Sequence, residues 1–351
     1  MTLKRRIIAE ITESGPLPFE RFMELALYDP EGFFGGDRLR SEKAGDFLTS
    51  PEVSPLFGRT LARLVDRIHK GIGDPFTLVE VGSGSGSLLR PLLEEVDVAA
   101  TAVEASPAAR EALSPLVPVS DRLPERIRGV VLANELLDNL PMALAQLVDG
   151  GWRERWVGTH GDGLAFVDAE PRPEVVAWLE SYAGPVDEGG WVEVQLEARR
   201  WLIDVLSRLE EGAVVTIDYG DTADNLAPRR RDGTLRTYRA HHLGPHPLDE
   251  PGATDITADV NFTALLDVGV GVSLHRQDDF LTGLGLRDRL SSLRTAELEA
   301  ARAGQDLERF RLRTERTEIE TLLHPRGLGD FRVLVVPSPG TVGVLQSVLT
   351  S

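Results

Sequence analysis

A glycine-rich turn at residues 79–87, VEVGSGSGS, constrains the fold more than any other feature of this chain. It follows the apolar run FTLVEV, which lies between Pro75 and Gly82 and is typical of a buried parallel strand. The residues after Gly86 predict a helix that begins directly after the turn. A strand, a glycine turn and a helix in this order are typical of an α/β fold in which a ligand comes close to the backbone.

Strand-like and helix-like segments continue to alternate after this turn. The alternation predicts an α/β fold, with a doubly wound, mostly parallel sheet that is covered by helices on both faces. In such a fold, ligands bind beyond the carboxyl ends of the strands. The predicted strands lie at 101–106, 129–135, 213–220 and 331–336, and the predicted helices at 107–116 and 197–212.

The rest of the chain predicts additions to this core. Residues 1–70 predict an N-terminal helical segment, and residues 71–351 the α/β core. We expect an insertion near 147–194, where two β-rich stretches resemble a hairpin, and a second one at 220–325. The second insertion holds a long aperiodic stretch, followed by a charged helical stretch at 288–322.

Composition excludes several classes of function. The 351 residues include 38 basic and 56 acidic ones, a net charge of −18 that argues against a nucleic-acid-binding surface. The absence of cysteine excludes disulfides, thiolate zinc sites and a cysteine nucleophile, and the seven scattered histidines predict no metal site. No stretch approaches the roughly 20 apolar residues that span a membrane. We therefore expect a cytoplasmic protein that binds neither nucleic acid nor membrane.

The spacing of the glycines narrows the choice of ligand. Gly82, Gly84 and Gly86 form G-x-G-x-G, whereas the dinucleotide fingerprint is G-x-G-x-x-G and would need glycine at Ser87. No Gly-Lys-Ser/Thr follows, so the turn is not a P-loop. The pattern still allows a nicotinamide oxidoreductase, or a tight turn without a ligand, but it favours neither.

Two acidic residues favour S-adenosylmethionine. Glu104 ends the second strand, where a carboxylate accepts the ribose hydroxyls of a nucleoside. Glu80 precedes the first glycine and would repel a pyrophosphate, but it suits the α-ammonium of S-adenosylmethionine, which carries no phosphate. The carboxylate of this cofactor would meet the N-terminus of the helix after Gly86.

A series of motifs in a fixed order carries a family resemblance. Together they resemble the MidA/NDUFAF7 family of S-adenosylmethionine-dependent methyltransferases. The chain has Phe33-Phe34 where that family usually has tyrosine, which removes two hydroxyl groups. The motifs are GDFLTSPEVSPLFG (45–58), LVEVGSGSGSL (78–88), VEASP (103–107), ANELLDNLP (133–141), IDYG (217–220), GTLRTYRAHH (233–242) and LGDFRVLVV (328–336).

The resemblance implies a class I methyltransferase fold, Rossmann-like, with a seven-stranded sheet and an inserted subdomain. It also implies that GDFLTSPE (45–52) folds over the cofactor as a lid, so that Thr49 and Pro51 contact it; N-cap chemistry through Thr49 or Ser50 is the alternative. The mitochondrial member methylates arginine in a complex I subunit. We therefore expect a protein substrate with arginine favoured, and the chain is a candidate homodimer.

The motif ANELLDNLP supplies the candidate catalytic residues. A guanidinium nucleophile is oriented best by carboxylates. We expect Glu135 to orient it, Asp138 to assist from one helical turn further on, and Asn134 to lie near the cofactor's methyl group. Asp218 is a further candidate at the end of another strand. Capping by Asn134 or Glu135, and a turn formed by Asp218, are the structural alternatives.

The sequence thus predicts a methyltransferase of a protein side chain. A non-catalytic assembly factor that binds S-adenosylmethionine, and a nicotinamide oxidoreductase, are the rival functions. The predicted catalytic residues are Glu135, Asp138 and Asp218, and the predicted cofactor-binding residues are Glu80, Gly82, Gly84, Gly86, Glu104, Asn134, Thr49 and Pro51.

Overall fold

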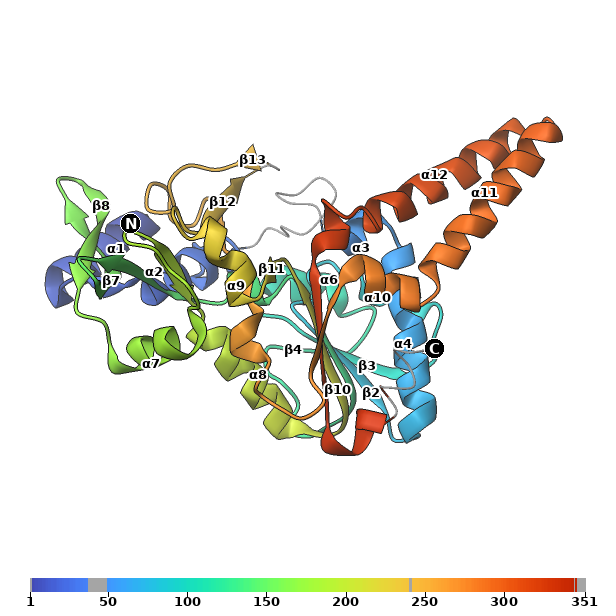
Figure 1. The fold of residues 1–351 in the computed structure, drawn as a ribbon, viewed down its shortest axis with the longest axis horizontal. Coiled ribbons are helices and arrows are strands. Elements are labelled where there is room, and N and C mark those ends of the chain that lie inside the picture. Colours follow the sequence, from blue (N-terminus) through green and yellow to red (C-terminus); the bar gives the residue numbers. More distant parts are fainter. Residues whose placement is uncertain (1, 37–48, 240–241, 344, 346–351) are drawn as a thin grey trace.

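The central feature is a seven-stranded sheet with the strand order β16-β17-β10-β5-β2-β3-β4 (Figure 1). The computed structural model describes residues 2–36, 49–239, 242–343 and 345. The strands from β10 to β4 are parallel, and β17 runs antiparallel to both of its neighbours. The strands are β2 (Thr77–Val81), β3 (Ala99–Val103), β4 (Val119–Ser120), β5 (Ile127–Asn134), β10 (Leu209–Asp218), β16 (Ser273–Arg276) and β17 (Arg332–Pro337).

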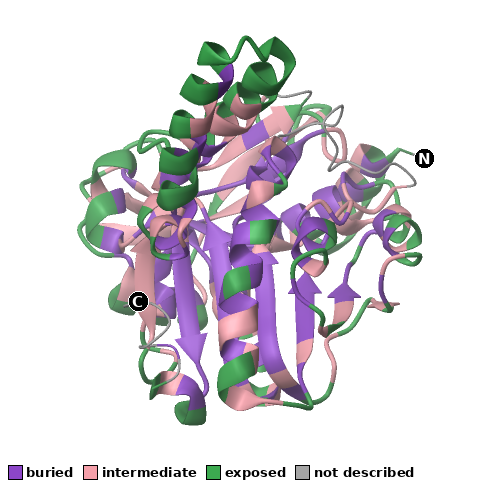
Figure 2. Cartoon of the chain, turned by 90° about the vertical axis from the view of Figure 1, so that its right-hand side faces the viewer, coloured by how far each residue is buried: buried purple, intermediate pink, exposed green. Residues whose placement is uncertain are grey.

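Helices cover both faces of this sheet, which confirms the predicted class I fold. One face packs against α4 (Leu56–Ile72), α5 (Leu89–Leu93), α6 (Pro107–Leu113) and α10 (Gln277–Gly283). The other face packs against α8 (Leu196–Arg208), whose buried residues recur at helical spacing. Figure 2 shows the strands as buried and the exposed residues on the outer helices.

A second sheet forms the inserted subdomain. Its order is β1-β7-β6-β9, with β8 paired to β7 in the hairpin that the sequence predicts. The N-terminal helices α1 (Leu3–Ser14) and α2 (Phe19–Tyr28) pack on this sheet. In contrast, α4 packs on the central sheet, and α3 (Ser50–Val53) packs against α4 and α12 (Asp306–Leu322). The strands are β1 (Leu17–Pro18), β6 (Ala143–Val148), β7 (Gly151–His160), β8 (Gly163–Ala169) and β9 (Trp191–Val194), and α7 (Pro173–Tyr182) packs beside them.

The second predicted insertion contains short strands and two long helices. A three-stranded sheet has the order β13-β12-β14, and β11 pairs with β15. The charged stretch forms α11 (Leu286–Arg302) and α12 (Asp306–Leu322), which project together from the body of the molecule (Figure 1). No described helix has the length and apolarity to cross a membrane. The short elements are β11 (Gly220–Asp221), α9 (Ala223–Leu226), β12 (Arg236–Arg239), β13 (His242–Leu243), β14 (Asp255–Thr257) and β15 (Val260–Asn261).

Candidate active site

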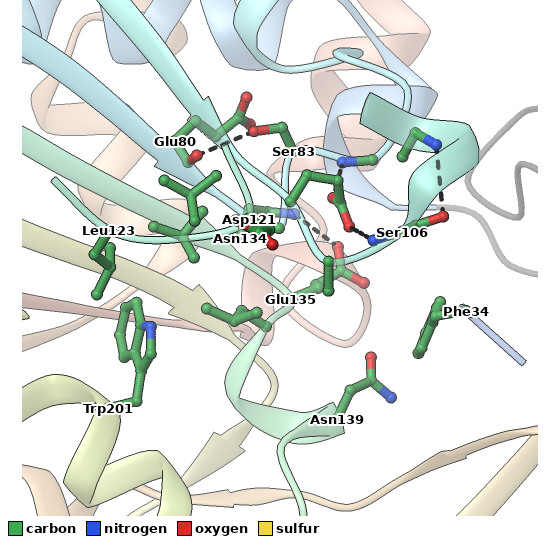
Figure 3. Close-up of a pocket in the computed structure, with 18 of the residues that line it drawn as sticks. Phe34, Glu80, Ser83, Ser106, Asp121, Leu123, Asn134, Glu135, Asn139 and Trp201 are labelled. Carbon is green, nitrogen blue, oxygen red and sulfur yellow. Dashed lines mark hydrogen bonds between the residues drawn. The ribbon is translucent and has the colours of Figure 1, made fainter. Parts of the chain in front are cut away.

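A cavity of about 690 Å³ lies at the carboxyl ends of β2, β3 and β5. Strand β2 is central: β3 and β4 lie on one side of it, and β5 and β10 on the other. The strand order therefore reverses between β2 and β5, which is where open α/β sheets bind their ligands. The turn after β2 and the residues after β5 both line this cavity (Figure 3).

The glycine turn needs glycine for two physical reasons. Gly82, Gly84 and Gly86 have φ angles of 71°, 52° and 78°, in the left-handed region that other residues avoid. A Cβ on Gly86 would also lie 2.9 Å from Leu113 Cδ2, so this glycine lets α6 pack against the turn. Gly82 and Gly84 line the cavity, whereas Gly86 supports it from behind.

Helix α5 follows the glycine turn. α5 starts at Leu89, and the Gly86 N–H donates to the Ser83 carbonyl (2.9 Å). Residues 84–88 form a non-helical turn, but the Arg90 N–H donates to the Gly86 carbonyl (3.0 Å), so the helical hydrogen bonds begin at Gly86 as the sequence predicts. The backbone N–H of Gly86 is occupied by this turn.

Glu104 holds the glycine turn from the end of β3. Its Oε2 accepts from the Gly84 N–H (2.9 Å), and its Oε1 accepts from the Ser106 N–H (2.8 Å). A carboxylate has about four acceptor sites, so two remain for ribose hydroxyls. Glu104 lines the cavity, in the position that its predicted role requires.

Glu80 and Asn134 each offer a buried acceptor atom. Glu80 Oε2 and Asn134 Oδ1 have no hydrogen-bond partner within the described residues, and both side chains line the cavity. Burial raises the pKa of Glu80 to about 8. A buried acceptor without a partner is costly, and a bound donor would relieve that cost. The α-ammonium of S-adenosylmethionine is such a donor, so the residues present fit this cofactor.

Glu135 occupies a special backbone position after β5. Its φ angle is 51°, which is unusual for a residue with a side chain, and its N–H donates to the Ile217 carbonyl (2.7 Å). Asn134 Nδ2 donates to Glu135 Oε1 (3.2 Å). Burial raises the pKa of Glu135 to about 8, with a smaller contribution from the charge of Asp138. A left-handed residue at a strand end aims this carboxylate into the cavity.

Asp138 and Asp218 do not line the cavity with Glu135. Asp138 Oδ2 accepts from the hydroxyls of Tyr219 and Thr257 behind the cavity wall. Asp218 accepts from the backbone N–H groups of Leu137 (2.9 Å) and Asp138 (3.3 Å). The structure therefore differs from the expected placement of the two aspartates.

The cause of this difference is local geometry. Residues Leu137–Asn139 form a 3₁₀ helix (η1), and Glu135 before it is left-handed, so the helical-turn spacing between Glu135 and Asp138 does not apply. Burial raises the pKa of Asp138 and of Asp218 above the ordinary range. Asp218 therefore holds the turn that follows Glu135.

Thr49 and Pro51 line the cavity at the start of α3. Thr49 also forms a capping box with Glu52, and its N–H donates to Glu52 Oε2 (3.0 Å). Thr49 therefore both caps α3 and lines the cavity, so its position agrees with both interpretations of the sequence. Residues 45–48 of the predicted lid lie outside the described part of the chain.

The sequence did not predict which residues line the two ends of the cavity. Trp201 of α8 and Leu123 lie toward one end, and Phe34 and Asn139 toward the other (Figure 3). Tyr28 closes the second end and donates to the Asn139 carbonyl (3.0 Å). The aromatic pair at Phe34 was the available signal for this end. Leu123 follows the two-residue strand β4, which is too short to give a periodic pattern.

The comparisons with known proteins agree with this site. The model of the family described as "Putative S-adenosyl-L-methionine-dependent methyltransferase" matches residues 56–278. A solved structure of a Burkholderia thailandensis protein bound to S-adenosyl-homocysteine is 30% identical, with a TM-score of 0.84, and the match covers 96% of this chain and 92% of that one.

Two named relatives match along most of their length. The protein named "Protein arginine methyltransferase NDUFAF7, mitochondrial" from Bos taurus is 30% identical, over 82% of this chain and 74% of the relative. The Homo sapiens protein of the same name is 28% identical, over 93% of this chain and 81% of the relative. The family match spans more than half of the chain, and the chain belongs to the MidA/NDUFAF7 family of S-adenosylmethionine-dependent methyltransferases.

Proposed function

We propose that this protein transfers the methyl group of S-adenosylmethionine to the guanidinium of an arginine side chain in a protein substrate. The proposal rests on the half-buried carboxylate of Glu135, which lines the same cavity as the aromatic rings of Tyr28 and Phe34. The names of the NDUFAF7 relatives support the same acceptor.

The charge of the cavity favours cationic ligands. Six acidic side chains line it, against two arginines. Acidic walls of low dielectric attract a cation and raise its local concentration. Both the sulfonium cofactor and a guanidinium acceptor carry positive charge. The acidic residues are Glu80, Glu104, Asp121, Glu125, Glu135 and Asp204, and the basic ones are Arg122 and Arg208.

The end of the cavity near Phe34 suits the acceptor side chain. The rings of Tyr28 and Phe34 lie 5.9 Å apart and both line this end. Aromatic faces and a carboxylate together bind a guanidinium well, by cation–π contact and paired hydrogen bonds. The opposite end, with Trp201 and Leu123, is left for the adenine of the cofactor.

In this proposal, residues of the chain position the guanidinium and accept the proton that it loses. When bound, S-adenosylmethionine supplies an activated methyl group on sulfur. Glu135 holds the guanidinium nitrogen in line with that group, and orientation of this kind supplies several kcal/mol of the barrier. A new nitrogen–carbon bond forms as the sulfur–carbon bond breaks, and the guanidinium loses one proton. Because its pKa is raised to about 8, Glu135 accepts this proton in its ionised form, whose share grows as the pH rises toward 8.

Methyl transfer to a complex protein mixture tests the proposal. We expect the protein to transfer labelled methyl from S-adenosylmethionine to proteins in a bacterial extract, and acid hydrolysis to release the label as N-methylarginine. Label in methyl-lysine, in methyl esters or in small molecules would show another acceptor. Cofactor binding without any transfer would instead support the non-catalytic assembly factor.

Glu80 makes cofactor binding release a proton. Because the pKa of Glu80 is about 8, its carboxyl is mostly protonated at pH 7 in the free protein and ionises when an ammonium binds beside it. Calorimetric titration at pH 7 in buffers of different ionisation enthalpy should show release approaching one proton, and the Glu80→Gln variant should release markedly less. Equal proton release by both proteins would place the ammonium away from Glu80.

A further inference from the structure

The side-chain amide of Asn139 presents an oxygen to the cavity. Asn139 is the last residue of η1, it lines the cavity at the end near Phe34, and it is only 8% exposed. In Figure 3 its oxygen points toward the side of the cavity where Glu135 lies, and its nitrogen points away. A buried polar atom in such a position needs a hydrogen-bond partner from a ligand or from water. Asn139 is therefore a candidate contact for the molecule that fills this end.

Three hydrogen bonds fix the position and the orientation of Asn139. Its Nδ2 donates to Asp255 Oδ1 (2.8 Å) and to the Ile256 carbonyl (3.1 Å), which uses both N–H donors of the amide. Its backbone carbonyl accepts from the Tyr28 hydroxyl (3.0 Å). An amide turned the other way would place its oxygen against a carboxylate and a carbonyl, which are both acceptors. The protein itself therefore turns the amide oxygen toward the cavity.

The amide oxygen is available to a ligand. No described residue donates to Asn139 Oδ1, although Nδ2 of the same amide has two acceptors. The side chain is already ordered by its other contacts, so a ligand that donates to this oxygen does not have to order it first. The oxygen therefore selects a ligand group that carries an N–H or an O–H.

The donors of the cofactor have other partners in the cavity. The arrangement proposed above places the α-ammonium at Glu80, the ribose hydroxyls at Glu104 and the adenine near Trp201. The sulfonium and its methyl group carry no N–H or O–H. The group that donates to Asn139 is then part of the methyl acceptor, because Asn139 lies at the same end of the cavity as Phe34.

A guanidinium has the donors to satisfy two separate acceptors at once. Its five N–H groups lie in one plane and belong to three nitrogens. While Glu135 holds the nitrogen that attacks the methyl group, a second nitrogen can donate to Asn139 Oδ1. Hydrogen bonds from a charged donor are the strong ones. This contact requires an N–H on the second nitrogen, and a nitrogen that carries two methyl groups has none.

We propose that Asn139 is a specificity-determining residue, whose side-chain oxygen accepts an N–H from a guanidinium nitrogen other than the one that receives the methyl group. This inference rests on the proposed transfer to arginine and deepens it. An arginine whose second nitrogen is dimethylated cannot form the bond, and it leaves the amide oxygen buried without a partner. The site therefore favours an arginine whose second nitrogen still carries an N–H.

Two cofactor mimics of equal charge test this contact by isothermal titration. Both are S-adenosylhomocysteine with a guanidinium tethered at the sulfur, and one of them carries two methyl groups on a terminal nitrogen. We expect the wild-type protein to bind the unmethylated mimic at least about tenfold more tightly, and Asn139→Ala to lower this preference to less than about threefold. Asn225→Ala is the matched control and should keep the full preference. Asn225 also donates to an aspartate (Asp221 Oδ1, 3.0 Å), but it is exposed and does not line the cavity.

The binding of plain S-adenosylhomocysteine separates this contact from general damage to the cavity. Asn139→Ala should bind it as the wild type does, and weaker binding would overturn the inference by making Asn139 a support of the cofactor. Asn139→Ser keeps a hydroxyl that can donate to Asp255, and it should lose the preference as well, so it serves if the alanine variant does not fold.

The outcomes distinguish this inference from the proposed function. A preference for the unmethylated mimic that survives both substitutions overturns the role of Asn139 and leaves the proposed acceptor intact. An unmethylated mimic that binds the wild type no better than plain S-adenosylhomocysteine overturns the proposed acceptor and this inference together.

Discussion

Replacing Glu135 with glutamine lowers kcat/KM for the protein substrate by about a thousandfold, while the dissociation constant of S-adenosylmethionine changes by less than about threefold. The amide keeps the shape of the side chain but loses the charge that pairs with a guanidinium. Wild-type kcat/KM should rise with pH toward about 8, as Glu135 ionises, and this rise should be smaller in the variant. Single-turnover methyl transfer measures the loss of activity, and calorimetry measures the dissociation constant of S-adenosylmethionine.

A matched substitution elsewhere in the cavity wall is the control for a general disturbance of the cavity. Glu125 also lines the cavity, but it is exposed and lies beyond β4, so Glu125→Gln should keep nearly full activity. The account of Glu135 would be contradicted if Glu135→Gln lost cofactor binding in parallel with activity. It would equally be contradicted if Glu135→Gln kept wild-type kcat/KM.

Replacing Glu104 with alanine raises the dissociation constant of S-adenosylmethionine by about a hundredfold. Hydrogen bonds to a charged group contribute about 1.5–3 kcal/mol each, and Glu104, which we propose binds the ribose hydroxyls, also accepts from the Gly84 and Ser106 N–H groups. Alanine leaves the glycine turn without that anchor. Isothermal titration of the cofactor measures the change directly.

A distant glutamate provides the comparison for this variant. Glu111 is exposed on α6, and Glu111→Ala should bind the cofactor as the wild type does. Unchanged affinity in Glu104→Ala would mean that the nucleoside lies elsewhere. Thermal unfolding of the cofactor-free protein distinguishes lost binding from lost folding.

The sequence predicts the central sheet well, because its strands are buried on both faces and read as apolar runs. The positions of Glu80, Glu104 and Glu135 follow from the same reasoning, since each lies at or just past the end of a predicted strand. Strand ends in a parallel sheet meet at one edge, so the order of the strands alone brings these three residues together.

The rest of the site depends on contacts between segments that are far apart in the sequence, and no local sequence pattern predicts such contacts. The placement of Asp138 depends on the left-handed conformation of Glu135 and on the 3₁₀ turn after it, and Asp218 accepts from the N–H groups of Leu137 and Asp138 in that turn. Tyr28 reaches the cavity because α2 packs on the inserted subdomain, which is a contact between distant segments. Sequence periodicity reports which face of a helix is buried, but not against which partner.

The affinity of a cofactor mimic that carries the acceptor tests directly whether Glu135 binds a guanidinium. An S-adenosylhomocysteine derivative with a guanidinium tethered at the sulfur would place that group where Glu135 is proposed to hold it. We predict that it binds the wild-type protein at least about thirtyfold more tightly than its neutral urea counterpart, and that Glu135→Gln removes most of this difference. Equal binding of the two compounds, or a preference that survives the substitution, would contradict the account.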